Sequence, residues 1–293
     1  MKHTLIPQEN IRIAPYTSMR VGGAVRYLYR PETEDQLVEL VAGCKAENTP
    51  YLVIGNASNL LFPDEGYNGV VIATGGIRSI TFENGLITAS CGVSLSALSV
   101  FAMEHGKKGL AFAFGIPGTV GGGVYMNAGA YGGELSDCLE HAVCIDAKGE
   151  KVTLSGEDLR LSYRHSRLQE EELLLLSATF RCEDGDPKEI KGEMDKNMAA
   201  RKEKQPLEYP SCGSAFKRPT GYYAGALIQE AGLKGLSMGG AQVSEKHAGF
   251  VINRGGATAK DVLRLEEYVK NEVFRRYGVT LEREVRVIDT LRA

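Results

Sequence analysis

Glycine is concentrated in one stretch of the chain, and this stretch restricts the possible folds more than any other feature. In GLAFAFGIPGTVGGGVYMNAGAYGG, residues 109–133, nine of the 25 residues are glycine. Few side chains and a proline-fixed turn let a backbone approach a large planar ligand and its phosphates closely. We therefore expect this stretch to fit neither a regular helix nor a strand well. Its candidate ligand-binding residues are Ile116, Pro117, Gly118, Thr119, Gly121, Gly122, Asn127, Ala128 and Gly129.

Two common nucleotide motifs are absent from this stretch. It lacks GxGxxG followed by an acidic residue about 20 positions later, and it lacks the GK[ST] of a phosphate-binding loop. A glycine-rich turn at a tight domain contact is the alternative interpretation.

A second candidate segment is YLVIGNASNLLF, residues 51–62. It reads as a strand that enters a turn of small and polar residues. Consecutive backbone N–H groups with little side-chain bulk suit a diphosphate. The candidate contacts are Gly55, Asn56, Ala57, Ser58 and Asn59. An ordinary polar turn between a strand and the next element is the alternative.

Composition excludes several other classes of protein. The 293 residues contain 34 Lys and Arg against 37 Asp and Glu, a formal net charge of −3. This balance does not favour nucleic acid or an anionic membrane as a partner. We find no run of about 18 apolar residues and no signal peptide in MKHTLIPQEN. The six cysteines have no CxxC spacing, so we expect no metal site and reduced thiols in a soluble, cytoplasmic chain.

The order of predicted elements indicates an α+β protein of about two or three domains. Thr33 and Ser94 have the form of helix caps, and Asp186-Pro187 begins a helix that should run to about Lys204. Glu83-Asn84-Gly85 lies between two strand-like runs and predicts a hairpin. Residues 205–210 hold two prolines and mark a domain boundary. Other predicted strands are residues 51–54, 70–73, 79–82, 86–90, 142–145, 152–154, 173–180, 249–253 and 281–288, and other helices are residues 222–231 and 258–277.

Three polar clusters lie far apart in the sequence. They are Tyr163-Arg164-His165-Ser166, the segment SCGSAFK at 211–217, and Glu282-Arg283-Glu284-Val285-Arg286. Strand alternation sends Glu282, Glu284 and Arg286 to one face. Taken singly, each cluster reads as a surface ion pair, a turn or a solvated strand face.

Together, these segments resemble the UDP-N-acetylenolpyruvoylglucosamine reductase family over essentially the whole chain. The matching motifs, in the order of that family, are TSMRVGG at 17–23, GNASNLL at 55–61, GIPGTVGGGVYMNAGAYGGE at 115–134, YRHS at 163–166, PSCGSAFKRP at 210–219, AGLKGLSMGGAQVSEKHAGFVIN at 231–253 and LEREVR at 281–286. The length is similar to the shorter subclass of the family. Two departures are Ala57, where glycine is common, and Phe114, where a smaller residue is common.

The resemblance implies an FAD-binding fold of the vanillyl-alcohol oxidase or PCMH type, with two α+β subdomains and a C-terminal α+β substrate-binding domain. We expect the subdomains at 1–84 and 85–204 and the substrate domain at 205–293, with the last strand, about 281–293, packing back on the first. The implied reaction is the NADPH-dependent, FAD-mediated reduction of UDP-N-acetylglucosamine enolpyruvate to UDP-N-acetylmuramate. It supplies peptidoglycan precursors, and through them cell-wall formation, cell shape and division.

The resemblance also implies roles for individual residues. Ser214 would protonate C2 of the enolpyruvyl group, Arg164 would hold the substrate carboxylate, and Glu284 would act at the same carboxylate through a hydrogen bond. These three residues would have to converge on one cleft. Candidate substrate contacts are Tyr163, Lys217, Arg218 and Gln242. We expect a monomer whose partners are NADPH and the nucleotide-sugar substrate, with no metal.

Two other functions compete with this one. An alcohol or sugar oxidase of the same fold would use FAD and oxygen, but the PSCGS and LEREVR motifs would then have no explanation. A non-catalytic nucleotide-sugar sensor would not need Ser214, Arg164 and Glu284 together.

Overall fold

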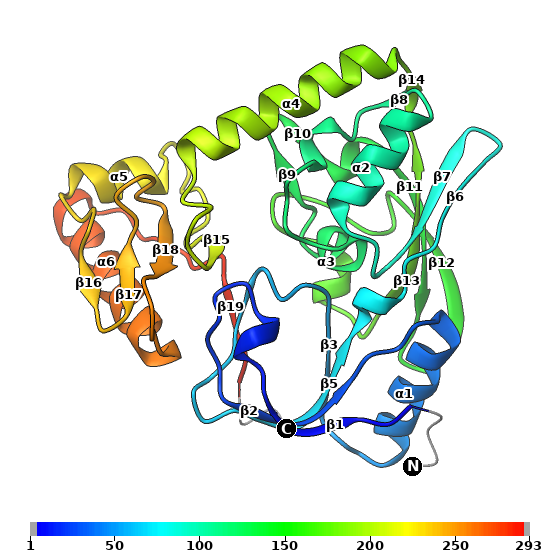
Figure 1. Cartoon of the computed structure of the whole chain (residues 1–293), viewed down its shortest axis with the longest axis horizontal. Coiled ribbons are helices and arrows are strands. Elements are labelled where there is room, and N and C mark those ends of the chain that lie inside the picture. The colour runs from blue at the N-terminus through cyan, green and yellow to red at the C-terminus, as the bar shows by residue number, and fades with distance from the viewer. Residues whose placement is uncertain (1–4, 290–293) are drawn as a thin grey trace. The chain divides into compact units, whose positions relative to one another are not determined.

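A computed structural model describes residues 5–289 of the chain. They form two compact units: unit 1 holds residues 5–7, 28–56 and 71–201, and unit 2 holds residues 8–27, 57–70 and 202–289. The chain passes between the units inside strands β2 and β5 (Figure 1). The helices are α1 (Glu34–Ala46), α2 (Leu95–Glu104), α3 (Val120–Tyr125), α4 (Pro187–Lys204), α5 (Ala224–Glu230) and α6 (Ala259–Tyr277).

Most strands are short. Those of the first half are β1 (Gln8–Arg12), β2 (Ala24–Tyr29), β3 (Tyr51–Ile54), β4 (Leu60–Leu61), β5 (Tyr67–Ala73), β6 (Ile80–Glu83), β7 (Leu86–Ser90), β8 (Lys107–Lys108), β9 (Gly129–Ala130), β10 (Gly133–Glu134) and β11 (Leu139–Ile145). Those of the second half are β12 (Lys151–Ser155), β13 (Leu174–Arg181), β14 (Glu183–Asp184), β15 (Ser211–Ser214), β16 (Ser237–Met238), β17 (Ala241–Val243), β18 (Phe250–Asn253) and β19 (Arg286–Val287).

The centre of unit 1 is a five-stranded antiparallel sheet with the strand order β12-β11-β13-β7-β6. Strands β6 and β7 form the predicted hairpin, in which Glu83 pairs with Leu86. Asn84 and Gly85 at its tip have φ angles of 52° and 80°, as a tight turn of the primed type requires. In the same unit, the end of β5 lies beside β3.

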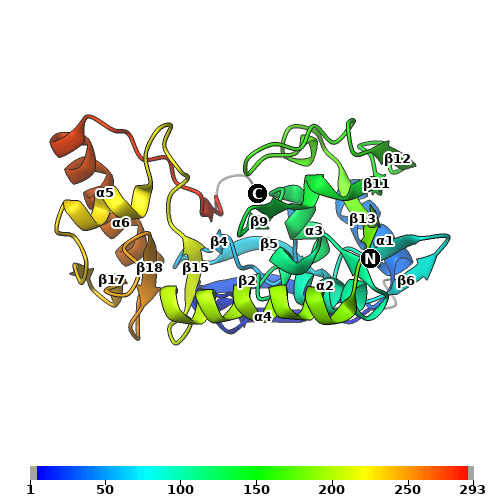
Figure 2. The same cartoon turned by 90° about the horizontal axis from the view of Figure 1, so that it is seen from above.

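Helices α2 and α3 pack together, and α3 lies against strands β13 and β7 (Figure 2). The predicted caps of unit 1 form: Thr33 accepts a hydrogen bond from the Gln36 amide and Ser94 accepts one from the Ala97 amide. Helix α4 spans Pro187–Lys204, as the sequence predicts.

The expectation that residues 109–133 fit neither a regular helix nor a strand is wrong in two places, because Val120–Tyr125 forms α3 and Gly129–Ala130 forms the short strand β9. Thr119 caps this helix, and the Val120 and Gly121 amides donate to the carbonyls of Val93 and Cys91. These long-range bonds offset the low helix propensity of three consecutive glycines. A Cβ on Gly123 would lie 3.0 Å from side-chain carbons of Leu95 and Leu135, so glycine also permits the close packing.

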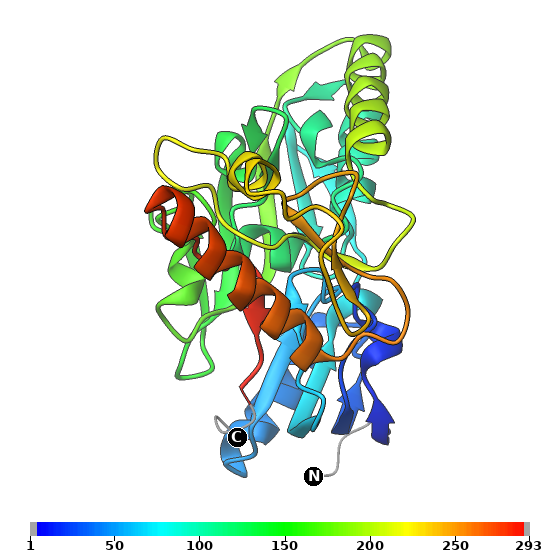
Figure 3. The same ribbon diagram turned by 90° about the vertical axis from the view of Figure 1, so that its left-hand side faces the viewer.

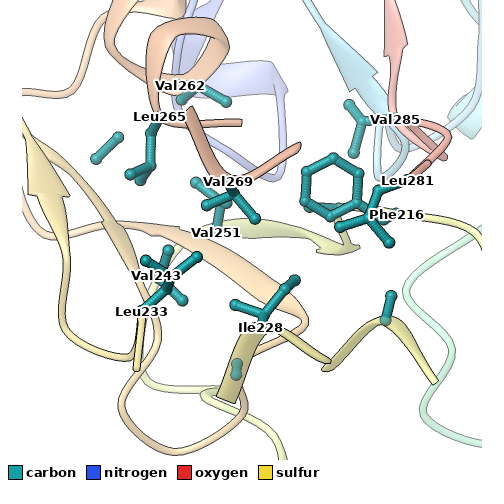
Figure 4. Close-up of a cluster of buried hydrophobic side chains, with 14 of the residues drawn as sticks. Phe216, Ile228, Leu233, Val243, Val251, Val262, Leu265, Val269, Leu281 and Val285 are labelled. Carbon is teal, nitrogen blue, oxygen red and sulfur yellow. The ribbon is translucent and has the colours of Figure 1, made fainter. Parts of the chain in front are cut away.

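Unit 2 contains a four-stranded antiparallel sheet with the order β15-β18-β17-β16. Helix α6 packs on β16 and β17 and against α5 (Figure 3). The buried side chains of these elements form one apolar cluster, which Figure 4 shows: it includes Phe216, Ile228, Val251, Val262, Leu265, Val269, Leu281 and Val285. Helix α6 begins after Thr258, whose side chain caps it by accepting a hydrogen bond from the Asp261 amide, and ends at Gly278, whose φ of 67° suits glycine.

The predicted final strand over residues 281–288 is only partly regular. Strand β19 covers Arg286–Val287 and pairs in parallel with β4, while Arg283 forms an isolated antiparallel bridge with Phe216. The segment therefore changes partner along its length, and no single ladder can run through it. The division into domains at 84 and 204 stays a prediction.

Within residues 5–289, no helix is both long and apolar enough to cross a membrane. All six cysteines lie in this range, where they are buried and carry free thiols. Burial raises the pKa of the Cys212 thiol, two residues before Ser214, to about 12. A thiol that is buried and protonated in this way reacts slowly with oxidants.

Candidate functional site

In unit 1, the structure brings the turn at Gly55 together with the glycine-rich stretch. The Asn56 side-chain amide donates a hydrogen bond to the Pro117 carbonyl over 3.0 Å. A Cβ on Gly55 would lie only 2.3 Å from Thr119 Oγ1, so only glycine allows this approach. Gly118 and Val120 are in turn bonded to the backbone of residues 93–95. Gly55 and Asn56 thus form one rigid surface with residues 116–122, which lie about 60 residues later in the sequence. We call this surface the glycine-rich wall.

Gly122 is the glycine of this wall whose small size no neighbouring protein atom requires. It is exposed, and a Cβ there would meet only Thr119 Oγ1, at 3.8 Å. In contrast, a Cβ on Gly121 would lie 3.1 Å from the Cys91 carbonyl oxygen. Open space beside a glycine, in a wall with few side chains, is a surface onto which a planar group can fit.

Replacing Gly122 with leucine is expected to lower FAD retention without unfolding the protein. The new side chain would enter open space on helix α3, so we expect a thermal midpoint no lower than that of the wild type in the protein without flavin. The measurement is the flavin-to-protein absorbance ratio after gel filtration. Gly192→Leu is the matched control, because Gly192 on α4 also has no neighbouring atom within 4 Å. Full flavin retention in Gly122→Leu would show that this wall does not contact the cofactor.

Asn127 ties the YRHS segment to the glycine-rich stretch. This buried side chain donates to the Ser162 carbonyl over 3.2 Å and accepts from the Ser136 amide over 3.0 Å. Gln169 adds bonds to the carbonyls of Tyr125 and Arg164. Because the Asn127 side chain and its backbone N–H, which donates to the Val124 carbonyl, are both used within the protein, its predicted cofactor contact gains no support here and stays a prediction.

Arg164 lies at the tip of the loop that these bonds hold. Ser162 and His165 exchange both backbone hydrogen bonds, and Arg164 between them has a φ of 57°. A side-chain-bearing residue in this left-handed region costs about 1–2 kcal/mol, and such strain often occurs at functional sites. The Arg164 guanidinium lies 5.1 Å from the ring centre of Tyr163, which is half exposed. The loop therefore fixes the backbone of Arg164 in place.

In unit 2, the structure brings Ser214 and Glu284 into neighbouring segments. Ser214 ends β15 and pairs with Phe250, and the carbonyl of the next residue, Ala215, accepts a hydrogen bond from the Glu284 amide over 2.9 Å. Two residues further on, the Lys217 amide donates to the Glu282 carbonyl over 2.8 Å. One backbone register thus fixes the positions of Ser214 and Glu284, the two predicted catalytic residues of this unit, along their neighbouring segments.

The predicted substrate contacts of unit 2 are Lys217, Arg218 and Gln242, and their side chains have different partners. Lys217 Nζ lies 2.5 Å from Glu282 Oε1 on the exposed edge of this pairing, and the Arg218 guanidinium lies 4.7 Å from the ring centre of Tyr223. Gln242 differs, because its amide donates to Gly235 O and Ser237 Oγ within the β16–β17 hairpin. The roles of Lys217, Arg218 and Gln242 as substrate contacts stay predictions.

The later part of the GNASNLL turn lies in unit 2. The Asn59 side-chain amide donates to the Glu284 carbonyl over 3.1 Å, and the Arg286 amide donates to the Asn59 carbonyl over 3.0 Å. Asn59 therefore helps to hold the segment of Glu284. The predicted contact of Asn59 with the cofactor, like that of Ser58, stays a prediction.

Ala57 has a φ of 46° and is buried, so its Cβ occupies the left-handed region. Glycine adopts this conformation without strain, and we therefore expect Ala57→Gly to raise the free energy of unfolding by about 1 kcal/mol. Chemical denaturation measures this change. Ala97→Gly on the exposed face of α2 is the control with an effect of opposite sign. It should lower the free energy of unfolding by about 1 kcal/mol. A destabilised Ala57→Gly would contradict this account of the turn.

Sequence reasoning missed two residues that organise the site. One is Asn127 as the tether of the YRHS loop, which depends on a partner 35 residues away. The other is Glu266 on α6, which is fully buried and pairs with Arg283. The spacing of Glu266 with Val262, Leu265 and Val269 did carry a signal, since it puts a carboxylate on the apolar face of an amphipathic helix.

Comparison with known proteins agrees with this geometry. Residues 25–155 match the model of an FAD binding domain, and residues 205–288 match the C-terminal domain of UDP-N-acetylenolpyruvoylglucosamine reductase. A reductase of that name from Lactobacillus delbrueckii subsp. bulgaricus is 48% identical over 281 residues, covering 96% of this chain and 95% of the relative. One from Caldanaerobacter subterraneus subsp. tengcongensis is 46% identical, covering 93% and 90%. The crystal structure of the enzyme from Thermus caldophilus has a TM-score of 0.83 at 35% identity, covering 97% of this chain and all of the other.

The fold and the glycine-rich wall therefore define a flavin-dependent oxidoreductase with an FAD-binding fold of the vanillyl-alcohol oxidase type. Relatives that share one name match this chain over nearly its full length, and they identify the family of flavin-dependent oxidoreductases. The chain belongs to the UDP-N-acetylenolpyruvoylglucosamine reductase (MurB) family.

Proposed function

We propose that this protein reduces UDP-N-acetylglucosamine enolpyruvate to UDP-N-acetylmuramate with FAD as its bound cofactor and NADPH as the electron source. The observation that carries the proposal is the register that sets Ser214 beside Glu284, in a chain that matches the family over almost its full length. The reaction adds two hydrogens across a carbon–carbon double bond, one as hydride and one as a proton.

The wall of Gly55, Asn56 and residues 116–122 supplies the surface that would hold FAD. Its exposed Gly122 leaves room for a planar group, and the few side chains of the wall would let a diphosphate approach its backbone closely. These residues would hold FAD, and the bound cofactor would supply hydride chemistry between NADPH and C3 of the enolpyruvyl group.

Charge develops on the substrate carboxylate as the hydride arrives, and this chain's own residues would stabilise it. The Arg164 guanidinium is planar and permanently charged, and it can donate two parallel hydrogen bonds to a carboxylate. Glu284 would donate a further hydrogen bond in its protonated form. A loop fixed in a strained conformation holds Arg164 in position before the charge appears, which is the condition for strong electrostatic stabilisation.

The Ser214 hydroxyl would deliver the proton to C2. A hydroxyl is a weak acid in water, but the acceptor here is a carbanion, and transfer to carbon is strongly downhill. The chemistry requires Ser214, Glu284 and Arg164 to reach one substrate.

The diphosphate of the substrate needs cations, and Lys217 and Arg218 are the proposed contacts. Tyr163 would provide an aromatic surface beside the sugar end, and Gln242 is a weaker contact. We further propose that the protein acts as a cytoplasmic monomer in peptidoglycan precursor synthesis, with the domain division at 84 and 204 given above.

The proposal is tested by anaerobic turnover. Purified protein loaded with FAD should oxidise more than one equivalent of NADPH per flavin only when the enolpyruvyl substrate is present, and mass spectrometry should find a product with two more hydrogens. An alcohol or sugar oxidase would leave the substrate unchanged and would consume oxygen with another reductant. Absence of product at any NADPH concentration would overturn the assignment.

A further inference from the structure

Glu266 is a carboxylate inside the apolar core of unit 2. Its side chain is fully buried on α6, next to Leu265 and one turn from Val262 and Val269 in the cluster of Figure 4. Oε2 accepts a hydrogen bond from Arg283 Nε, whereas Oε1 has no hydrogen-bond partner among residues 5–289. Burial raises the pKa of Glu266 despite the nearby Arg283. Such a group is costly to bury, and stability alone does not explain its presence.

Its partner Arg283 lies on the segment that carries Glu284. Leu281 and Val285 of this segment are buried in the core, and Arg283 bridges Phe216, which is also buried. Residues directly opposite in an antiparallel pair share one face, so Arg283 faces the core with Phe216 while Glu284 faces away from it.

The apolar residues of this segment cannot fix its register by themselves. A slip of one residue would bury Glu282 and Glu284, whereas a slip of two residues would keep the alternation but move Arg283 to the buried position of Leu281 or Val285, away from Glu266. It would also put Glu282 or Arg286 where Glu284 now pairs with Ala215. Of the three alternate residues Leu281, Arg283 and Val285, only Arg283 carries a charge. A two-residue slip would separate Arg283 from Glu266 and leave both side chains buried without each other, so this pair favours the native register.

We propose that Glu266 is the positioning residue of this site: by binding Arg283 in the core, it sets which residue of the segment pairs with Ala215 and so places Glu284 beside Ser214. Fixing a register is the best-attested use of a buried polar or ionic group. The inference rests on the proposed function for the roles of Glu284 and Ser214, but the register itself does not depend on them.

The test compares three variants of the full-length, FAD-loaded protein. Glu266→Gln keeps the shape and removes the charge. The double variant Glu266→Met/Arg283→Met replaces the pair with apolar side chains, which often leaves a fold as stable or more so. Glu267→Gln is the matched control, since Glu267 is the next residue on α6 and pairs at the surface with Lys270.

The first readout is hydrogen exchange at the amides of Lys217 and Glu284, which donate across this pairing. We expect these amides to exchange at least about tenfold faster in Glu266→Gln and in the double variant, while the amides of α5 stay protected. Unchanged protection at both amides would overturn the proposal, whatever the activity. Glu267→Gln should match the wild type.

The second readout is the rate at which the enolpyruvyl substrate reoxidises the reduced flavin. A misplacement of about 1 Å can cost about 100-fold, so we expect a fall of 10- to 100-fold in kcat with little change in KM, and an unchanged reduction rate with NADPH. The double variant should keep the thermal midpoint of the wild type yet remain slow. A double variant with full activity would show that the pair is merely structural. If the wild type is not reoxidised by this substrate, the proposed function fails, and hydrogen exchange alone decides the role of Glu266.

Discussion

Ser214→Ala is expected to slow the reoxidation of reduced FAD by the enolpyruvyl substrate by about 10³-fold, within the range of about 10²–10⁴ typical of general acid–base catalysis. The variant removes the proposed proton donor and leaves the backbone of β15 and its pairing with Phe250 intact. NADPH does not need this proton, so its reduction of the flavin should keep the wild-type rate. Anaerobic stopped-flow absorbance of the flavin separates these two half-reactions.

Ser211→Ala is the matched control for this measurement, because Ser211 begins the same strand and pairs with Ile252. It should retain the wild-type rate in both half-reactions. Equal slowing of both half-reactions in Ser214→Ala would remove Ser214 from its assigned role, since a lost proton donor affects only the step that forms the product.

Arg164→Ala should reduce the rate of the same half-reaction by about 10²–10³-fold, the usual effect of losing one preorganised group at a developing charge. Arg164→Lys should recover little of it, because an ammonium cannot replace a planar donor pair. The flavin content should stay unchanged, since the loop is held by Asn127 and Gln169 and not by the guanidinium.

Arg160→Ala provides the control for Arg164. Arg160 also has a positive φ, of 48°, but its guanidinium pairs with Glu170 and Glu171 on the surface. It should leave both half-reactions unchanged. Flavin-free Arg164→Ala protein would mean that Arg164 supports the cofactor and not the substrate.

The sequence alone was sufficient for elements defined by local chemistry. The caps at Thr33 and Ser94 each lie within three residues of the amide that they bind, and Gly278 ends α6 by its own φ angle. Asp186-Pro187 likewise predicts the start of α4 from two adjacent residues. Such signals need no knowledge of the rest of the fold.

Elements that depend on distant partners were predicted less well. Helix α3 forms because residues 91–93 accept its first amide hydrogens, and the predicted final strand is interrupted because it changes partner from 215–217 to 59–61. Sequence motifs identified the candidate residues of the site, but they did not identify the residues that hold these candidates in place. Asn127 and Glu266 each act through a residue that only the folded chain brings near.

The central claim is that this flavoprotein passes electrons from NADPH to the enolpyruvyl ether of a UDP sugar. The most direct test is the visible spectrum of the FAD-loaded protein under anaerobic conditions, first with NADPH and then with UDP-N-acetylglucosamine enolpyruvate. We predict that NADPH bleaches the flavin absorbance and that the enolpyruvyl substrate restores it before any oxygen is admitted. Absorbance that returns only with oxygen would contradict the account and favour an oxidase.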